Sequence, residues 1–268
     1  MKIGKGGNPA SSIATANAET IVVRGFDLCK DLIGQVSLTE HFWLLVTGQR
    51  ASTAQGRVLD ACMVAISEHG LVPSVQAARM TYAAGPEAMQ GAVAAGILGC
   101  GSVILGSAEN AGRFIAKALE GAANGDMKAA AHAIVQEYRA QKRPFPGYGH
   151  PLHKDADPRA ARLVEAAKQN GIGGKHVEMA YAIEAAIRDI VGKSLVFNVS
   201  GAIPAVLLDA GFPMAGLKGV PILARTASLV GHLVEEQLRP IGFLLSEAGE
   251  KAIAYDGTTP AGFVPGAH

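Results

Sequence analysis

The chain has 268 residues, of which 49% are hydrophobic and 18% are charged, and its formal net charge is +1 at pH 7. A chain of this length and composition can bury a large core, which argues against disorder and fits one large domain or two modest ones. A net charge this close to zero excludes a broad basic surface that would attract nucleic acid or an anionic membrane. We therefore expect no nucleic-acid or membrane partner, and a few placed cations must bind any anionic ligand.

The N-terminal twenty residues contain no apolar core of the signal-peptide type. The first expected element is the segment ETIVVRGFDL, residues 19–28, which is the best candidate for a strand or hairpin. The three cysteines, Cys29, Cys62 and Cys100, lie far apart without CxxC spacing, so neither a disulfide framework nor a zinc knuckle is indicated. Reduced core thiols are typical of the cytosol, and we expect a cytoplasmic protein.

Most of the remaining chain has the periodicity of helices. Residues 55–70 repeat apolar side chains on one helical face and end at Gly70, a good C-cap residue. Residues 88–108 carry no charge and are long enough to cross a bilayer, but their five glycines favour a buried core or subunit-interface helix. Asp157 is an expected N-cap, with Pro158 at the first helical position. Helical spacing also predicts helices within residues 109–126, 126–143, 175–192 and 224–240.

The segment PFPGYGHPLHKDADPR, residues 144–159, concentrates ionisable side chains behind a Pro-Gly-Tyr-Gly turn. His150 follows two glycines, where a rigid loop can project the imidazole toward a ligand. The local sequence leaves two interpretations open, a functional histidine or an ordinary turn histidine. His153, Lys154 and Arg159 form a cationic rim that suits carboxylates or phosphates. Metal binding by His150 and His153 also stays open, although their spacing is not a strong metal signature.

Five segments in order resemble the citrate synthase superfamily, and together they cover nearly the whole chain. PGYGHPLHKDADPRA resembles the family's Gly-x-Gly-His loop with its following Asp-Pro-Arg. ISEHGLVPS resembles an Asp-His-Gly segment, with Glu68 in place of Asp, and LVFNVSGAIP resembles an Asn-Val-Asp segment. LARTASLVGHLVEEQ resembles the late helix whose arginine binds a substrate carboxylate, and residues 19–49 resemble the N-terminal segment. The short chain is more similar to the compact citryl-CoA lyase module of ATP-citrate lyase than to a citrate synthase.

The resemblance implies an all-α, citrate synthase-like fold. Residues 1–106 and 216–268 would form the large helical domain, and residues 107–215 the smaller, inserted helical domain. The active site would lie in a cleft between them. A homodimer, or a higher homo-oligomer, would bury the uncharged glycine-rich segment, because a two-fold interface is the commonest solution.

Three departures from the family's pattern bear on function. Ile104 stands where citrate synthase has a catalytic histidine, and the lyase module also has an apolar residue there. Ser200 stands where both relatives have an aspartate that handles a proton, and a serine is a poor base unless a partner activates it. Pro151 stands where the relatives have an arginine, so one cationic contact to substrate is missing.

The resemblance assigns roles to residues of this chain. The expected catalytic residues are His69, His150 and Ser200, and the expected substrate-binding residues are Arg225, Arg159 and His153. Coenzyme A, as part of an acyl-CoA substrate or product, would be bound without a metal by Gly147, Tyr148, Gly149, Lys154 and Lys193. His232 lies near Glu235 and Glu236 at helical spacing, which favours a structural role.

Three functions remain open at this point. The first is a carbon–carbon lyase that splits citryl-CoA or a related 3-hydroxyacyl-CoA into acetyl-CoA and a keto acid such as oxaloacetate. The second is a condensing enzyme of the citrate synthase type, against which Ile104 and Ser200 both count. The third is a CoA-thioester-binding protein with altered or lost chemistry, which Ser200 would explain directly. We expect the lyase.

Overall fold

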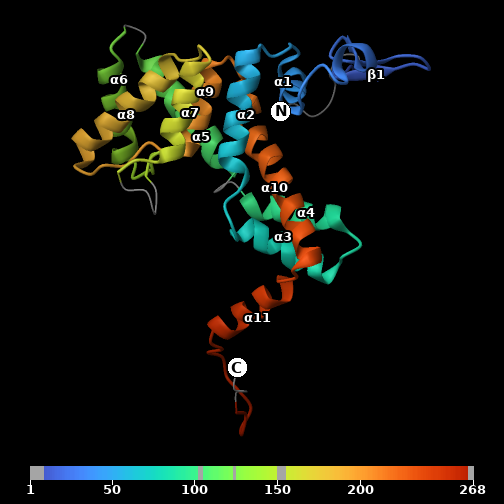
Figure 1. Cartoon of the computed structure of the whole chain (residues 1–268). Helices are drawn as coiled ribbons and strands as arrows, with labels where there is room; N and C mark the ends of the chain where they lie inside the picture. Colours follow the sequence, from blue (N-terminus) through green and yellow to red (C-terminus); the bar gives the residue numbers. More distant parts are fainter. Residues whose placement is uncertain (1–8, 102–104, 123–124, 150–154, 265–268) are drawn as a thin grey trace. The chain divides into compact units, whose positions relative to one another are not determined.

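The computed structural model describes residues 9–101, 105–122, 125–149 and 155–264, and five residues singled out above, Ile104, His150, Pro151, His153 and Lys154, lie outside these ranges. Two compact units divide the chain: unit 1 comprises residues 1–65 and 107–220, and unit 2 comprises residues 66–106 and 221–268. The predicted helical fold is confirmed (Figure 1). The predicted domains, 1–106 with 216–268 and 107–215, stay a prediction.

Unit 1 begins with a small antiparallel sheet of β1 (Ala14–Ala16), β2 (Ile21–Val23) and β3 (Phe26–Asp27), in that order. Val23 pairs with Phe26, so the hairpin turn consists of Arg24 and Gly25, and both have positive φ, as two-residue hairpin turns favour. The hairpin predicted within residues 19–28 is therefore confirmed. Strand β1 was not predicted, because three small, exposed residues are too few to give a strand pattern.

The helices of unit 1 follow the sheet in chain order. Several begin at the caps that the sequence provides: Ser37 and Glu40 form a capping box, and Asp157 caps a helix with Pro158 at its first position, as predicted. The elements are η1 (Leu28–Leu32), α1 (Leu38–Thr47), α2 (Thr53–Ser67), α5 (Gly106–Gly121), α6 (Met127–Ala140), α7 (Pro158–Gln169), α8 (Lys175–Val191), α9 (Val199–Asp209) and η3 (Met214–Gly216).

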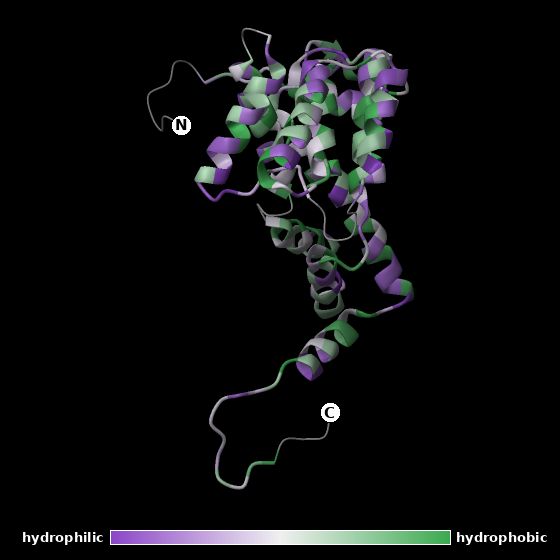
Figure 2. Ribbon diagram, turned by 90° about the vertical axis from the view of Figure 1, so that its left-hand side faces the viewer, coloured by the Kyte–Doolittle hydropathy of each residue, from purple (hydrophilic) through white to green (hydrophobic). Residues whose placement is uncertain are grey.

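The core of unit 1 is built around α9, which packs against α7 and α8. Its residues Gly201–Leu207 are all buried, as expected for a helix that is apolar on every side. The rings of Phe114, Tyr138, Tyr148 and Phe197 form a chain of aromatic contacts beside it. Most helices combine hydrophilic and hydrophobic residues in Figure 2, which fits helices that bury one face.

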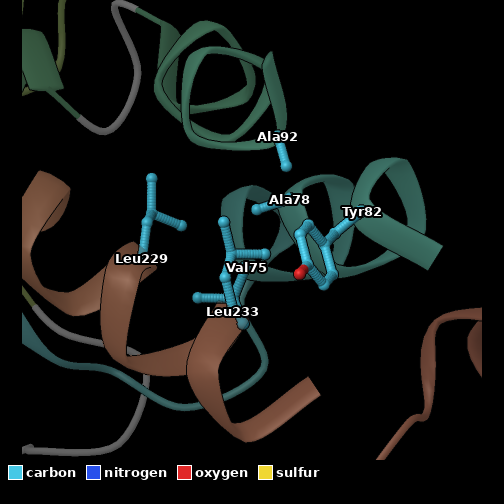
Figure 3. Packing of buried hydrophobic residues seen from close by; sticks show 6 residues of the cluster. All are labelled: Val75, Ala78, Tyr82, Ala92, Leu229 and Leu233. Carbon is cyan, nitrogen blue, oxygen red and sulfur yellow. The ribbon is translucent and has the colours of Figure 1, made fainter. Parts of the chain in front are cut away.

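Unit 2 consists of α3 (Pro73–Ala84), α4 (Met89–Cys100), α10 (Gly219–Leu238) and α11 (Gly242–Ala252), and the first two residues of α10 belong to unit 1. Figure 3 shows the core of unit 2, in which side chains from α3, α4 and α10 meet. The buried members of this core are Val75, Ala78, Tyr82, Ala92, Leu229 and Leu233.

The uncharged segment 88–108 was predicted to be a single helix, but it contains the whole of α4 and the first residues of α5. Gly101 has a φ of +49°, a conformation that favours glycine and ends α4. Within α4, Ala92, Gly96 and Cys100 are buried, so the predicted core role holds for this part. Among the described residues, no helix combines the length and apolar character that a bilayer span requires.

Two of the three cysteines are buried and all three are free thiols. Cys62 and Cys100 lie in the core, as predicted, and burial raises the pKa of the Cys62 thiol far above its ordinary value. Cys29 differs from the prediction, because it is exposed at η1.

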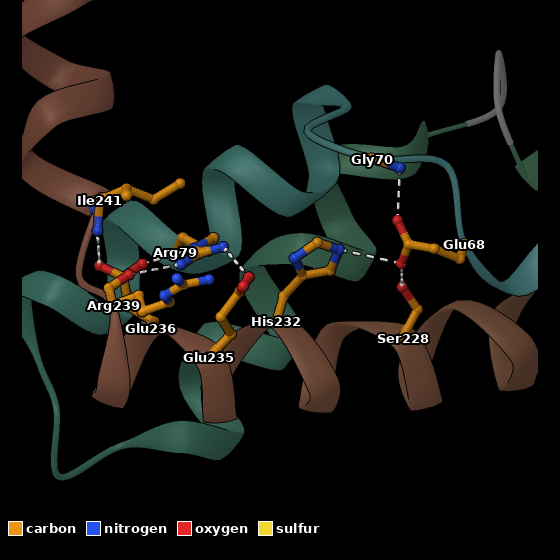
Figure 4. A network of polar contacts seen from close by, with 10 residues as sticks. Glu68, Gly70, Arg79, Ser228, His232, Glu235, Glu236, Arg239 and Ile241 are labelled. Atoms are coloured by element: carbon orange, nitrogen blue, oxygen red, sulfur yellow. Dashed lines mark hydrogen bonds and ion pairs between the residues drawn. The ribbon is translucent and has the colours of Figure 1, made fainter.

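A buried ion pair fixes α10 to α3 and to the start of α11 (Figure 4). The Arg79 guanidinium donates to Glu236 at 2.6 Å and to Glu235 at 2.9 Å. The other oxygen of Glu236 accepts from the backbone N–H groups of Ile241 and Gly242. Burial raises the pKa of Glu236, but these hydrogen bonds outweigh it and hold the pKa below the ordinary value, so the pair stays charged.

Candidate functional site

The glycine-rich loop 147–149 lies against the residues that precede α9. Tyr148 pairs with Phe197 in an antiparallel bridge, the Gly149 N–H donates to Val196 O at 2.8 Å, and the Asn198 N–H donates to Gly147 O at 3.0 Å. The side-chain amide of Asn198 also donates to Gly149 O at 2.7 Å. Asn198 is the N-cap of α9, so the loop is fixed directly at the start of that helix.

Two glycines allow this close approach. Gly147 has a φ of +88°, and a Cβ atom there would lie 2.8 Å from the Cα of Gly201. A Cβ atom on Gly201 would lie 2.6 Å from the Phe197 ring and 2.9 Å from Gly147 O. The loop can therefore lie on α9 only with glycine at both positions.

Tyr148, expected to bind CoA, points its side chain into unit 1. Its hydroxyl donates to Ala180 O at 2.8 Å, and its ring packs against Phe114 and Phe197. Burial, reinforced by the nearby Glu184 carboxylate, raises the pKa of Tyr148 well above its ordinary value. The phenol therefore stays protonated, and the expected contact of Tyr148 with CoA stays a prediction.

Asp157 joins the starts of α7 and α9. Its buried carboxylate accepts from the backbone N–H and the guanidinium of Arg159, and from the Val199 N–H at 2.9 Å. Burial raises the pKa of Asp157, but the hydrogen bonds from Arg159 and Val199 outweigh it and lower the pKa overall. Arg159, expected to bind substrate, is held in this ion pair and is partly exposed.

Ser200 lies half-buried in the first turn of α9. Its Oγ accepts a hydrogen bond of 3.2 Å from Ser107 Oγ, at the start of α5. The α9 cluster is the set of residues at these three helix starts and the loop beside them, namely Ser107, Gly147, Gly149, Asp157, Arg159 and Ser200. The first N–H groups of α9 donate to Asp157 and Asn198, so the groups of this cluster that suit an anionic ligand are the hydroxyls of Ser107 and Ser200 and the guanidinium of Arg159. Lys193 is exposed on the connection between α8 and α9.

In unit 2, the carboxylate of Glu68 ties a loop to α10 (Figure 4). One oxygen accepts from the backbone N–H groups of His69 at 2.9 Å and Gly70 at 2.5 Å. The other accepts from the Ser228 hydroxyl and lies 3.0 Å from His232 Nε2. Partial burial raises the pKa of Glu68, but these hydrogen bonds outweigh it and lower the pKa to about 2.

Arg225 and His69 belong to the same part of unit 2. Arg225 is buried on α10, one turn before Ser228 and two turns before His232, so all three share one helical face. His69 is exposed on the loop that Glu68 holds. The α10 cluster is the set Glu68, His69, Arg225, Ser228 and His232, and three of its members line an open depression on unit 2.

His232 corrects one expectation. Helical spacing predicted Glu235 and Glu236 as its neighbours, but Arg79 binds both carboxylates and His232 contacts Glu68 instead. Helical spacing cannot reveal this partner, because Glu68 comes from a segment 164 residues away in sequence.

The structure thus brings the predicted residues together in two groups. Ser200, Arg159, Gly147 and Gly149 lie in the α9 cluster, whereas His69 and Arg225 lie in the α10 cluster. The predicted meeting of His69, His150 and Ser200 in one cleft stays a prediction. Sequence reasoning missed the roles of Ser107, Asn198 and Ser228. Only Asn198 carried a usable signal, since asparagine before an apolar helix indicates an N-cap.

The chain matches the sequence profile of "Citrate synthase, C-terminal domain" over residues 10–241. The chain belongs to the citrate synthase family. Citryl-CoA lyase from Hydrogenobacter thermophilus is 33% identical, with a TM-score of 0.84, and the match covers 95% of this chain and 97% of that lyase. Both parts of the resemblance, to the citrate synthase superfamily and to citryl-CoA lyase, are confirmed.

Two further proteins are less similar to this chain. ATP citrate lyase from Methanothrix soehngenii, solved in complex with citrate and coenzyme A, is 20% identical with a TM-score of 0.79 over 97% of this chain and 43% of its own. That likeness shows the fold. Citrate/2-methylcitrate synthase of Bacillus subtilis (strain 168) is 26% identical over 205 residues, 75% of this chain and 53% of the synthase. The chain therefore spans about half the length of that relative.

In the part of the chain that the structure describes, no group of three or more His, Cys, Asp or Glu side chains is arranged to hold a metal ion. The α9 cluster instead offers two hydroxyls and a guanidinium, and the α10 cluster offers an arginine and an imidazole. These groups can bind anionic oxygens and move protons.

Proposed function

We propose that the protein cleaves the carbon–carbon bond of citryl-CoA, or of a related 3-hydroxyacyl-CoA, to give acetyl-CoA and a keto acid. The observation that carries the proposal is the likeness to citryl-CoA lyase from Hydrogenobacter thermophilus, which covers nearly all of both chains. The match to the Bacillus subtilis synthase covers only about half of the synthase. Ile104, in place of the synthase histidine, also favours cleavage over condensation.

The reaction makes two demands on the protein. A base must remove the proton of the 3-hydroxyl group, so that the C–O bond becomes C=O while the adjacent C–C bond breaks. The electron pair of that bond passes to the leaving CH₂ of acetyl-CoA, whose enolate needs hydrogen-bond donors and finally a proton. Imidazoles titrate near neutral pH and can serve as the base or as the acid.

Residues of both clusters fit these demands. Arg225 is the candidate for a substrate carboxylate, since a guanidinium binds a carboxylate with two parallel hydrogen bonds. His69 and His150 are the candidate acid, base or donor. The hydroxyls of Ser200 and Ser107, at the starts of α9 and α5, are candidate donors to a developing oxyanion. Gly147 and Gly149 allow the chain to approach the CoA thioester closely.

Ser200 supports a second candidate function, a CoA-thioester-binding protein with altered chemistry. Its hydroxyl replaces the carboxylate that the family's pattern provides, and its hydrogen-bond partner is another hydroxyl, that of Ser107. Neither serine is activated by a base in this contact, so the pair alone supplies no proton acceptor.

Assays on purified protein separate these functions. A lyase produces a keto acid and acetyl-CoA from citryl-CoA without releasing free CoA thiol, and both products can be measured spectrophotometrically. A condensing enzyme consumes acetyl-CoA and oxaloacetate and releases free thiol. A binding protein does neither but binds acetyl-CoA in titration calorimetry. We expect the first result, and free-thiol release without cleavage would contradict it.

A variant at His150 tests the proposed catalytic role of this histidine in the same assay. Replacing His150 with Ala should lower turnover of citryl-CoA about a hundredfold or more, the usual scale for a general acid–base group. Replacing His132, which pairs with Asp189 on the α6 and α8 side of unit 1, should leave turnover unchanged. Equal activity of the His150→Ala variant and the wild-type protein would remove His150 from the mechanism.

A further inference from the structure

The side chain of Glu68 is half-exposed, yet each of its two carboxylate oxygens contacts two hydrogen-bonding groups of the protein. We propose that Glu68 is a positioning residue that holds the His69 loop against the face of α10 carrying Arg225, so that both side chains act on one carboxylate-bearing substrate. This inference rests on the proposed function and adds to it the residue that sets the geometry of the substrate-binding groups.

The contacts of Glu68 divide evenly between the loop and the helix. Oε1 accepts from the backbone N–H groups of His69 and Gly70, and Oε2 accepts from Ser228 and faces His232 Nε2. Each carboxylate oxygen has two lone pairs, so four donors satisfy the group completely. An amide of the same length has one acceptor oxygen and one NH₂ group, and it cannot accept from both sides at once.

The Glu68 carboxylate thus acts as a clamp between the loop and α10. On the helix side, this clamp binds the face of α10 that bears Arg225. Ser228 and His232 follow Arg225 by three and seven residues, so they lie along the same side of α10. Holding the loop to Ser228 and His232 therefore fixes the His69 backbone relative to the helical face from which Arg225 projects. Both ends of the clamp lie within unit 2.

The other side of the loop is held as well. Gly70 has a φ of +66°, which lets the chain turn sharply behind the carboxylate. The side-chain amide of Gln76 donates to Leu71 O at 2.7 Å, and the Val72 N–H donates to Gly70 O at 2.8 Å. The residues that follow His69 are thus hydrogen-bonded to the start of α3, and the carboxylate of Glu68 bonds the loop to α10.

Glu235, which lies on α10, provides a comparison with Glu68. Its side chain is 47% exposed, close to the 53% of Glu68, and both line the same depression. Glu235 accepts from Arg79 and contacts no backbone N–H of the loop in the described structure. Neutralising either carboxylate therefore removes one negative charge from this surface. Only the change at Glu68 also removes the contacts with the loop, so the two variants separate a positioning role from an effect of charge.

The test compares Glu68→Gln, Glu68→Asp and Glu235→Gln with the wild-type protein. Glu68→Gln should lower kcat/KM for citryl-CoA about tenfold or more, because small displacements of substrate-positioning groups are costly. Glu68→Asp retains the carboxylate and should regain most of that loss, and Glu235→Gln should stay within about twofold of wild type. A Glu68→Gln variant with wild-type kcat/KM, or an equal loss in Glu235→Gln, would overturn the inference.

A second measurement does not depend on catalysis. Hydrogen exchange of the His69 and Gly70 amides should accelerate about tenfold or more in Glu68→Gln, while exchange in α9 stays unchanged. If the wild-type protein does not cleave citryl-CoA, the proposed function is wrong. The exchange measurement still tests whether Glu68 holds the loop. Unchanged exchange at His69 and Gly70 in Glu68→Gln would overturn the positioning role whatever the substrate.

Discussion

Asp157 shows how much a single buried carboxylate contributes to the α9 cluster. It accepts from the Val199 N–H and from Arg159, so the starts of α7 and α9 share one anion. The sequence alone predicted Asp157 as an N-cap, because Asp before Pro at a helix start is a local signal. Its second partner could not be predicted, since Val199 lies 42 residues further along the chain.

Replacing Asp157 with Asn should destabilise unit 1 by about 2–4 kcal/mol at pH 7, because an NH₂ group would face donors and the buried ion pair with Arg159 would be lost. Chemical denaturation of both proteins measures the difference. Asp155→Asn is the matched control, since Asp155 is exposed two residues earlier. An unchanged free energy of unfolding in Asp157→Asn would contradict the prediction.

The pH dependence of this effect has a definite sign. The pKa of Asp157 is lowered in the folded protein, below its ordinary value of 3.8. Its ionised form therefore stabilises the fold above about pH 4, and this contribution is lost as the pH falls through the folded-state pKa. The difference between wild type and Asp157→Asn should consequently shrink as the pH falls below about 4.

At the scale of elements, α9 is the helix on which the loop 147–149 depends. The sequence predicted neither its contact with the loop nor its close approach, because a glycine pair such as Gly147 and Gly201 has no visible spacing rule. Helices with clear periodicity and caps, such as α7, were predicted well. The break between α4 and α5 was missed, because five glycines in an uncharged stretch hide which one ends the helix.

Replacing Gly201 with Ala tests that contact. The added Cβ would lie 2.6 Å from the Phe197 ring and 2.9 Å from Gly147 O, so the loop or the ring must move. We expect a loss of about 1–3 kcal/mol in the free energy of unfolding, the usual cost of overpacking. Gly121→Ala in α5 is the control, because its Cβ would make only ordinary contact with Ala130 at 3.7 Å. Equal stability of the two variants would show that the loop tolerates the displacement.

At the scale of the whole molecule, the family and its fold were predicted mainly from the order of short motifs along the chain. Five short segments in the right sequence indicated the family, and the match over residues 10–241 and the likeness to citryl-CoA lyase agree with it. The site was harder to predict, because its geometry depends on contacts between distant segments, such as Glu68 with Ser228. A motif gives residue types and spacing, and packing decides which of them touch.

Assembly is the remaining prediction at this scale. Among the glycines of α4, Gly96 is buried and a Cβ there would lie 2.7 Å from Leu229 of the same unit, whereas Gly91 and Gly99 are exposed, so the expected contact of this segment with a second subunit stays a prediction. Exposed large apolar side chains occur on several helices, Leu98 of α4 among them, and five of them lie on α10 and α11. These five are Val230, Val234, Leu238, Phe243 and Leu244. The first three follow one another at intervals of four residues and form one stripe, and a contiguous exposed stripe is typical of an interface.

We therefore expect a homodimer, or a multiple of it, that buries this stripe. Light scattering at micromolar concentration should give at least twice the 27.6 kDa of the chain. Val234→Asp places a charge in the stripe and should shift the protein toward the monomer, because an unpaired charge is costly to bury. Leu38→Asp, on an exposed position of α1, should leave the mass unchanged. A wild-type mass of one chain would contradict the dimer, and a Val234→Asp variant that keeps the wild-type mass would place the interface elsewhere.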